Sequence, residues 1–313
     1  MASLSVVKAS GAGTGALLSA CVAEHGSAAR RGLWASVPQA GVPAGSLLAA
    51  GVLALLAATL SEEDFVAWGW RIPFLASFVL ILVGWWIRRA VGETPSFRRE
   101  VEEAGAHPKV PALDVFRERP KALLVGSGLR VGENIIYYII TVFSITYMTE
   151  IARLHRAQAL NAILIGAAIH FLSIPLFGAL SDRIGRRIVY AAGAFGGAAF
   201  AFLFFAMLGS GDYGQAVIAV TIALLLHGAM YGPQAAFIAE LFPTRIRYSG
   251  ASIAYQLTSI VAGSLAPIIA LALYQQEKSA TPVAIYVAIA CAVSGVAALL
   301  ARETRGVRLE EIR

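Results

Sequence analysis

Several charged and hydrogen-bonding side chains interrupt the apolar run 122–149. They are Arg130, Glu133, Asn134, Tyr137, Tyr138 and Thr141. Spacings of three and four residues place most of them along one face of a helix. Turned toward a central cavity, that face would offer a cation for a carboxylate substrate, a titratable acid and aromatic hydrogen-bonding groups. In a second interpretation, Arg130 and Glu133 only neutralise each other as a structural ion pair.

Other apolar runs carry isolated polar residues, which are costly inside a membrane and are therefore functional candidates. A histidine could relay protons because its reference pKa lies near physiological pH, or it could simply hydrogen-bond one helix to another. His170, midway along the run 158–180, ranks last among these candidates. The remaining members are His227, Tyr231 and Gln234 in the run 215–238, Tyr255 and Gln256 in 248–274, and Gln39 in 34–60.

A charged stretch, Gly178-Ala-Leu-Ser-Asp-Arg-Ile-Gly-Arg-Arg187, joins two long apolar runs. We expect a short loop, with Gly178 and Gly185 permitting close approach and unusual backbone dihedrals. Its arginines indicate the cytoplasmic side, and an ordinary basic loop is the plain alternative. Charge-assisted hydrogen bonds from such a loop would hold helices together in one access state only. The expected gating residues are Asp182, Arg183, Arg186 and Arg187, with Glu240 and its neighbours Arg245 and Arg247.

The composition defines a membrane protein. The 313 residues are 58% hydrophobic and 14% charged, whereas a soluble domain carries about a quarter charged residues. The net charge of +6 needs no nucleic acid to explain it, because basic residues gather in cytoplasmic loops. Cys21 and Cys291 are far apart and indicate small buried residues. We find no metal-ligand spacing, nucleophile elbow or nucleotide loop, so we expect no metal, no cofactor and no enzyme.

Apolar runs of about 20 residues, each long enough to cross a bilayer, predict an all-α polytopic protein with about nine spans. We expect a first helical part at 1–91, a cytoplasmic connector at 92–121, a six-helix half at 122–301 and a cytoplasmic tail at 302–313. The predicted spans are 5–22, 34–60, 72–91, 122–149, 158–180, 188–208, 215–238, 248–274 and 281–301.

An internal repeat divides the chain into two related parts. Glu24 and the basic residues after it resemble Glu240 and the residues after it, and Glu93-Thr94 resembles Glu303-Thr304. Repeated halves joined by a connector are typical of secondary transporters. Four spans precede Glu240 in its half, but only 23 residues precede Glu24. We therefore expect roughly three spans and one gating loop to be missing from the N-terminal half.

The order G-x-L-S-D-R-x-G-R-R resembles the signature loop of the major facilitator superfamily. Further motifs resemble its metabolite:proton symporter branch, the shikimate-like members most closely, and together they cover nearly all of residues 24–306. They are Trp68-Gly-Trp-Arg-Ile-Pro-Phe74, Glu93-Thr-Pro-Ser-Phe97, Tyr231-Gly-Pro-Gln-Ala-Ala-Phe237 and Glu240-Leu-Phe-Pro-Thr-Arg-Ile-Arg247.

The resemblance implies a major facilitator fold reduced from twelve helices to about nine, in a bacterial cytoplasmic (inner) membrane. It implies proton-coupled symport of a small organic acid or zwitterionic metabolite by alternating access. The partners would be that metabolite, the proton and the lipid bilayer. The alternative is a non-functional transporter fragment from a truncated or mis-started gene.

Overall fold

The computed structural model describes residues 28–75 and 112–307, with a few positions between 78 and 89. Every regular element in this part of the chain is helical. The elements are η1 (Ala28–Arg30), α3 (Arg31–Thr59), α4 (Glu62–Ala67), η2 (Gly69–Arg71), α7 (Ala112–Glu118), α8 (Pro120–Tyr138), η3 (Ile139–Phe143), α9 (Ser144–Thr146), η4 (Tyr147–Ile151), α10 (Arg156–Ile184), α11 (Arg186–Gly209), α12 (Tyr213–Ala239), α13 (Thr244–Thr258), η5 (Ser259–Gly263), α14 (Ala266–Glu277) and α15 (Thr281–Leu300).

Within the described residues, seven helical stretches are long and apolar enough to cross a membrane. Each corresponds to a predicted span, so the prediction of an all-α membrane protein is confirmed. The predicted spans 5–22 and most of 72–91 lie outside the described residues, and the total of nine stays a prediction. The helix α7 lies within the predicted connector 92–121.

Local sequence explains where several helices begin. Proline stands in the first turn of α8, α14 and α15, where a missing backbone N–H costs nothing. Asp212 caps α12 by accepting a hydrogen bond from the Gln215 backbone N–H at 2.7 Å. Two spans contain π-helical turns, η3 and η4 after α8 and η5 after α13. Such turns reposition side chains and recur at functional sites.

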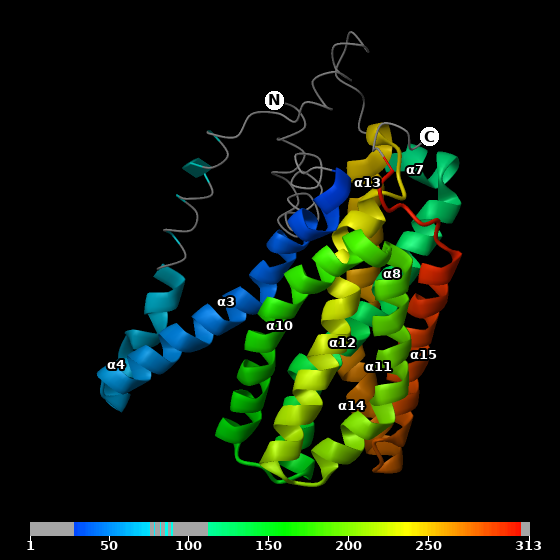
Figure 1. The fold of residues 1–313 in the computed structure, drawn as a ribbon. Helices are drawn as coiled ribbons and strands as arrows, with labels where there is room; N and C mark the ends of the chain where they lie inside the picture. Colours follow the sequence, from blue (N-terminus) through cyan, green and yellow to red (C-terminus); the bar gives the residue numbers. More distant parts are fainter. Residues whose placement is uncertain are drawn as a thin grey trace.

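The central helix of the bundle is α12, which packs against α10, α11 and α8, while α15 closes the far side against α8 and α11. The helix α3 packs against α10 and α12 only along its first part, where Ala35, Ser36 and Ala40 are buried. Farther along it diverges from the bundle toward α4 (Figure 1), and Leu48 is 69% exposed. The helix α3 is therefore joined to the bundle at its N-terminal end and lies away from it at the other end.

Glycines bring α10 and α12 into backbone contact. A Cβ added at Gly232 would lie 2.5 Å from the Ile174 carbonyl oxygen and 2.9 Å from the Gly178 nitrogen. Both neighbours are backbone atoms that cannot rotate away. Small residues allow this close packing where lipid gives no hydrophobic drive for helix association.

Replacing Gly232 with alanine is therefore expected to lower the free energy of unfolding by about 1–3 kcal/mol through overpacking. Thermal unfolding of the protein in detergent measures the effect. Gly51→Ala is the matched control, because its Cβ would meet no described atom within 4 Å and alanine favours a helix interior. Equal stability of the two variants would contradict close packing at Gly232.

Candidate substrate site and gate

A buried ion pair lies at the centre of the bundle. Arg130 and Glu133 of α8 are 7% and 4% exposed, and the Arg130 Nη1 donates to the Glu133 Oε2 at 2.5 Å. The same Nη1 donates to the Gln234 Oε1 of α12 at 2.9 Å, and Nη2 donates to the Ser259 hydroxyl of η5 at 3.0 Å. Three transmembrane elements therefore converge on one guanidinium.

Other polar groups complete the surroundings of the Glu133 carboxylate. Its Oε2 also accepts from the Asn134 Nδ2 at 3.1 Å and from the Gln234 Nε2 at 3.2 Å. Its Oε1 faces the Nε2 of His227 on α12, at 3.1 Å. A buried carboxylate this well supplied with donors is stable as an anion only while those donors stay in place.

The two intramembrane histidines form a chain that ends at Glu133. The Nδ1 of His227 lies 2.9 Å from the Nε2 of His170 on α10, and both residues are 1% exposed. The Tyr137 and Tyr231 rings flank His227, with ring centroids 5.0 and 5.2 Å away. His170, the last-ranked candidate from the sequence, therefore belongs to this site. We call the whole group the polar cluster, and its members are Arg130, Glu133, Asn134, His170, His227 and Gln234.

Three buried donors beside this cluster make no hydrogen bond of normal geometry among the described residues: the Arg130 Nε, the Gln39 Nε2 and the Tyr255 hydroxyl. The Arg130 guanidinium lies over the Tyr255 ring, 4.2 Å from its centroid. Gln39 of α3 lies beside the Tyr255 hydroxyl. Buried polar groups normally find partners, so these three neighbouring donors are candidates to bind an acceptor from outside.

The other predicted members of this site lie apart from the polar cluster. Tyr138 is 36% exposed and packs against Gly263. Thr141 returns its hydroxyl to the Tyr137 carbonyl at 2.8 Å. Gln256 is half-buried on α13. That Tyr138 faces inward with Tyr137 stays a prediction.

Tyr190 of α11 and Ser259 were not predicted from the sequence as members of the site. The Gln234 Nε2 donates to the Tyr190 hydroxyl at 3.4 Å, and that hydroxyl donates to the Leu129 carbonyl. Tyrosine and serine at ordinary helical positions give no local signal. The π-helical turn that directs Ser259 toward Arg130 is likewise invisible in the sequence.

The expected gating loop is mostly helix, which corrects the sequence prediction. Gly178 to Ile184 complete α10, Gly185 alone breaks the helix at φ 111°, and α11 starts at Arg186. The φ of Gly185 lies in a region that favours glycine. Gly178 has the expected close approach: a Cβ there would lie 2.7 Å from the Gly32 carbonyl oxygen.

Asp182 ties α10 to α3. Its two carboxylate oxygens accept hydrogen bonds from the Gly32 and Leu33 backbone N–H groups, at 2.8 and 2.9 Å. An anion at this position satisfies orphan donors at a helix N-terminus and is favoured by the helix dipole. The Arg186 Nη1 donates to the Asp182 Oδ1 at 2.6 Å, which holds the carboxylate in place.

Glu240, at the end of α12, is 1% exposed and binds two arginines. Its Oε1 accepts from the Arg31 Nη1 of α3 at 2.9 Å, and its Oε2 accepts from the Arg186 Nε of α11 at 3.5 Å. The Thr304 hydroxyl donates to the same Oε2. We call this set, with Asp182, the gate network, because it joins α3 to three helices of the six-helix half.

The remaining predicted gating residues contribute less. Arg245 does not join Glu240; it is exposed and pairs with Asp114 (3.3 Å) and Glu118 of α7, which corrects the prediction. Arg187 donates to the Leu299 carbonyl. Arg183 is exposed, and its backbone carbonyl accepts a hydrogen bond from the Arg305 side chain. Arg247 donates its Nε to the Ala239 and Phe242 carbonyls, both at 3.2 Å.

Arg31, Glu303 and Thr304 were missed as gate residues. Glu303 caps α11 by accepting from the Arg186 and Arg187 backbone N–H groups, at 3.0 and 3.2 Å. The repeated Glu-Thr pair was a usable signal, since Glu303-Thr304 matches Glu93-Thr94. The copy at Glu93 lies outside the described residues.

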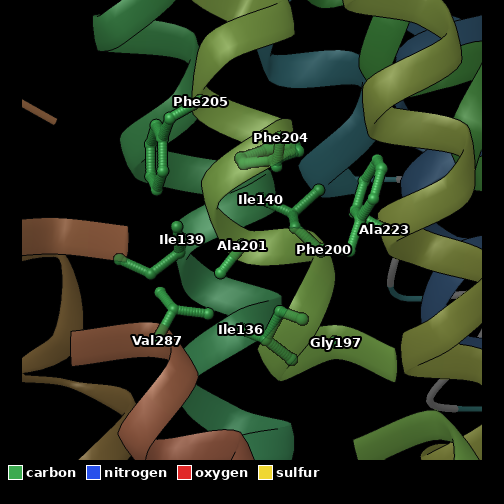
Figure 2. Close-up of a pocket in the computed structure, with 10 residues that line it drawn as sticks. All are labelled: Ile136, Ile139, Ile140, Gly197, Phe200, Ala201, Phe204, Phe205, Ala223 and Val287. Atoms are coloured by element: carbon green, nitrogen blue, oxygen red, sulfur yellow. The ribbon is translucent and has the colours of Figure 1, made fainter. Parts of the chain in front are cut away.

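An apolar cavity among the described residues lies apart from the polar cluster and is too small for a metabolite. Figure 2 shows ten residues around it, from α8, η3, α11, α12 and α15, and all are apolar or glycine. Its volume is about 10 Å³, which is room for one water at most and offers it no polar partner. No group of His, Cys, Asp and Glu among the described residues has the arrangement of a metal site, and Cys291 is buried as a free thiol.

The fold is that of the major facilitator superfamily. The structure superimposes on the proton:xylose symporter XylE with a TM-score of 0.73 and 20% sequence identity, over 95% of this chain and 70% of that chain. The protein is thus a helical membrane protein of this fold, with charged residues buried at its centre.

Sequence comparison identifies the family. The profile described as "Sugar (and other) transporter" matches residues 9–110 and 101–313. The shikimate transporter of Escherichia coli K12 is 34% identical over 88% of this chain and 64% of its own length. The inner membrane metabolite transport protein YhjE of the same strain is 34% identical over 90% and 65%. The proline/betaine transporter of Salmonella typhimurium is 30% identical over 90% and 58%.

The chain therefore belongs to the sugar (and other) transporter family of the major facilitator superfamily. It spans less than two thirds of the length of these relatives: 64% of the shikimate transporter, 65% of YhjE and 58% of the proline/betaine transporter.

Proposed function

We propose that the protein is a proton-coupled symporter of a small organic acid or zwitterionic metabolite in the bacterial inner membrane, working by alternating access. The observation that carries this proposal is the group of unused donors on Arg130, Gln39 and Tyr255. A carboxylate has two oxygens that accept several hydrogen bonds, and a guanidinium binds it with matching geometry. Shikimate, proline and betaine, the substrates named for the relatives, all carry a carboxylate.

Position in the fold supports the same proposal. Arg130 and Tyr255 belong to the six-helix half, whereas Gln39 belongs to α3 of the other part. A ligand held by all three would bridge the elements that rock against each other in alternating access. The gate network closes α3 onto α10 and α12 at one end, as one access state requires.

Uptake into proteoliposomes tests the proposal. The 313-residue chain is reconstituted with an inward proton gradient, and accumulation of labelled shikimate is measured with and without a protonophore; proline and glycine betaine are tested in parallel. Accumulation that collapses with the gradient is the expected result. Gradient-independent entry would exclude symport, and no entry of any of the three would exclude transport of these carboxylates by this chain.

Asp182→Asn is expected to slow turnover several-fold while changing substrate affinity less. The amide keeps one acceptor for the α3 N-terminus but loses the charge that holds it and Arg186, so the closed state is weakened. Initial uptake rates and equilibrium binding of shikimate measure the two effects separately. The matched control is Asp212→Asn, at the exposed N-cap of α12. A defect confined to binding would contradict a gating role.

A further inference from the structure

We propose that His170 and His227 deliver the coupling proton to Glu133, and that neutral Glu133 releases Arg130 to the substrate carboxylate. This inference rests on the proposed function and goes beyond it by assigning the proton acceptor, its delivery route and its competition with substrate. Three observations carry it: the linear order of the four side chains, the saturation of one Glu133 oxygen, and the unused Nε of Arg130.

The four side chains are in series. The His170 Nε2 is 2.9 Å from the His227 Nδ1, and the His227 Nε2 is 3.1 Å from the Glu133 Oε1. The other carboxylate oxygen, Oε2, is 2.5 Å from the Arg130 Nη1. His227 thus contacts His170 and Glu133 through its two different ring nitrogens. His170 contacts His227 through Nε2, which leaves its Nδ1 to receive a proton, as a relay requires.

The proton step balances along this series. A proton binds the Nδ1 of His170, whose Nε2 proton moves to the His227 Nδ1. The His227 Nε2 proton then moves to the Glu133 Oε1 and makes the carboxyl group neutral. Both rings finish neutral in their other tautomer, and the positive charge that entered at His170 is now the uncompensated charge of Arg130.

Neutral Glu133 no longer pairs with Arg130 as an ion. The guanidinium, already free at Nε, then pairs with a substrate carboxylate beside Tyr255 and Gln39. A buried cation without a counter-ion is strongly disfavoured, so the proton and the anionic substrate must enter together. This mutual requirement couples the movement of the substrate to the movement of the proton.

Glu133 is surrounded by groups that could interfere with its titration. The titratable or charged residues facing it are Arg130 and Tyr137 on α8, His170 on α10, Tyr190 on α11, His227 and Tyr231 on α12, Tyr255 on α13 and Cys291 on α15. Of these, only the two histidines normally gain or lose a proton between pH 5 and 8.

The first test needs no substrate. Infrared difference spectra of the full chain, acidified against neutral, should contain a protonated-carboxyl C=O band that is missing from Glu133→Gln. The band should persist in Glu277→Gln, which removes an exposed acid at the end of α14. Superimposable spectra of the wild type and Glu133→Gln would overturn the assignment of Glu133 as proton acceptor.

The second test uses shikimate as the probe and counts protons. Wild-type protein in weakly buffered detergent should take up one proton per shikimate bound, and the Kd should rise about tenfold per pH unit above the transition. Glu133→Gln should bind with no proton uptake and a flat pH profile. Proton uptake by Glu133→Gln equal to that of the wild type would overturn the proposal.

The third test separates the relay from the acceptor. His227→Gln and His170→Gln should keep one proton per shikimate at equilibrium but slow proton-driven uptake at least about tenfold. His155→Gln, an exposed histidine at the start of α10, is the matched control. Wild-type rates in both relay variants would overturn the delivery route. If wild-type protein fails to bind shikimate, the proposed substrate class fails, and the infrared test alone decides the assignment of Glu133.

Discussion

Arg130→Ala is expected to abolish measurable binding of an anionic substrate, with a loss of at least about 30-fold in affinity. Truncating a buried, hydrogen-bonded charge costs about 2–5 kcal/mol in binding. In the proposed site the guanidinium supplies the cation, and its Nε is one of the three donors that make no hydrogen bond of normal geometry. Isothermal titration calorimetry with shikimate on the detergent-solubilised chain measures the effect.

The same substitution also leaves Glu133 buried without its cation, which costs about 3–5 kcal/mol in stability. The double variant Arg130→Ala/Glu133→Gln removes both charges and is expected to recover most of that stability without recovering binding. A folded Arg130→Ala variant that keeps wild-type affinity for shikimate would mean that the Arg130–Glu133 pair has only a structural role. This is the second interpretation given in the sequence analysis.

Glu240→Gln is expected to destabilise the protein by about 3–5 kcal/mol, because it removes the carboxylate that pairs with buried Arg31 and leaves buried Arg186 with Asp182 alone. Arg31 and Arg186 come from different helices and meet only at this carboxylate. Loss of the charge should also separate α3 from α12, since Arg31 is the ionic contact between them. Chemical unfolding in detergent gives the free energy, and spin labels on α3 and α12 give the separation.

Glu277→Gln is again the control, as an exposed glutamate whose removal should change stability by less than about 0.5 kcal/mol. A double-mutant cycle with Arg31→Met isolates the Arg31–Glu240 coupling from the other contacts of Glu240. Full additivity of the two substitutions would mean that the gate network is a set of independent contacts.

Much of the fold was predictable because a bilayer imposes its own regularity. Every span inside the described part follows from apolar length alone, and the ion pair Arg130–Glu133 follows from its spacing of three. The contacts between helices were not predictable in this way. His170 and His227 are 57 residues apart, and no local pattern states that α10 and α12 pack face to face.

The gate region illustrates the same limit in another form. The motif around Asp182 was recognised, but a loop was expected where the structure continues α10 to Ile184. Charged residues at the end of a span suggest a loop, although arginine and aspartate are compatible with a final helical turn exposed to water. Arg245 was assigned to Glu240 by proximity in sequence, whereas α7, a helix from the connector, supplies its acidic partners.

The backbone contact between α10 and α12 has a kinetic consequence. A Cβ at Gly228 would lie 2.6 Å from the Ser173 hydroxyl and 3.4 Å from the His170 ring, so the two helices are closely packed there. In the proposed alternating-access cycle, we expect this close packing to keep the distance between His170 and His227 constant. The proposed relay through the two rings would then have the same length in every access state.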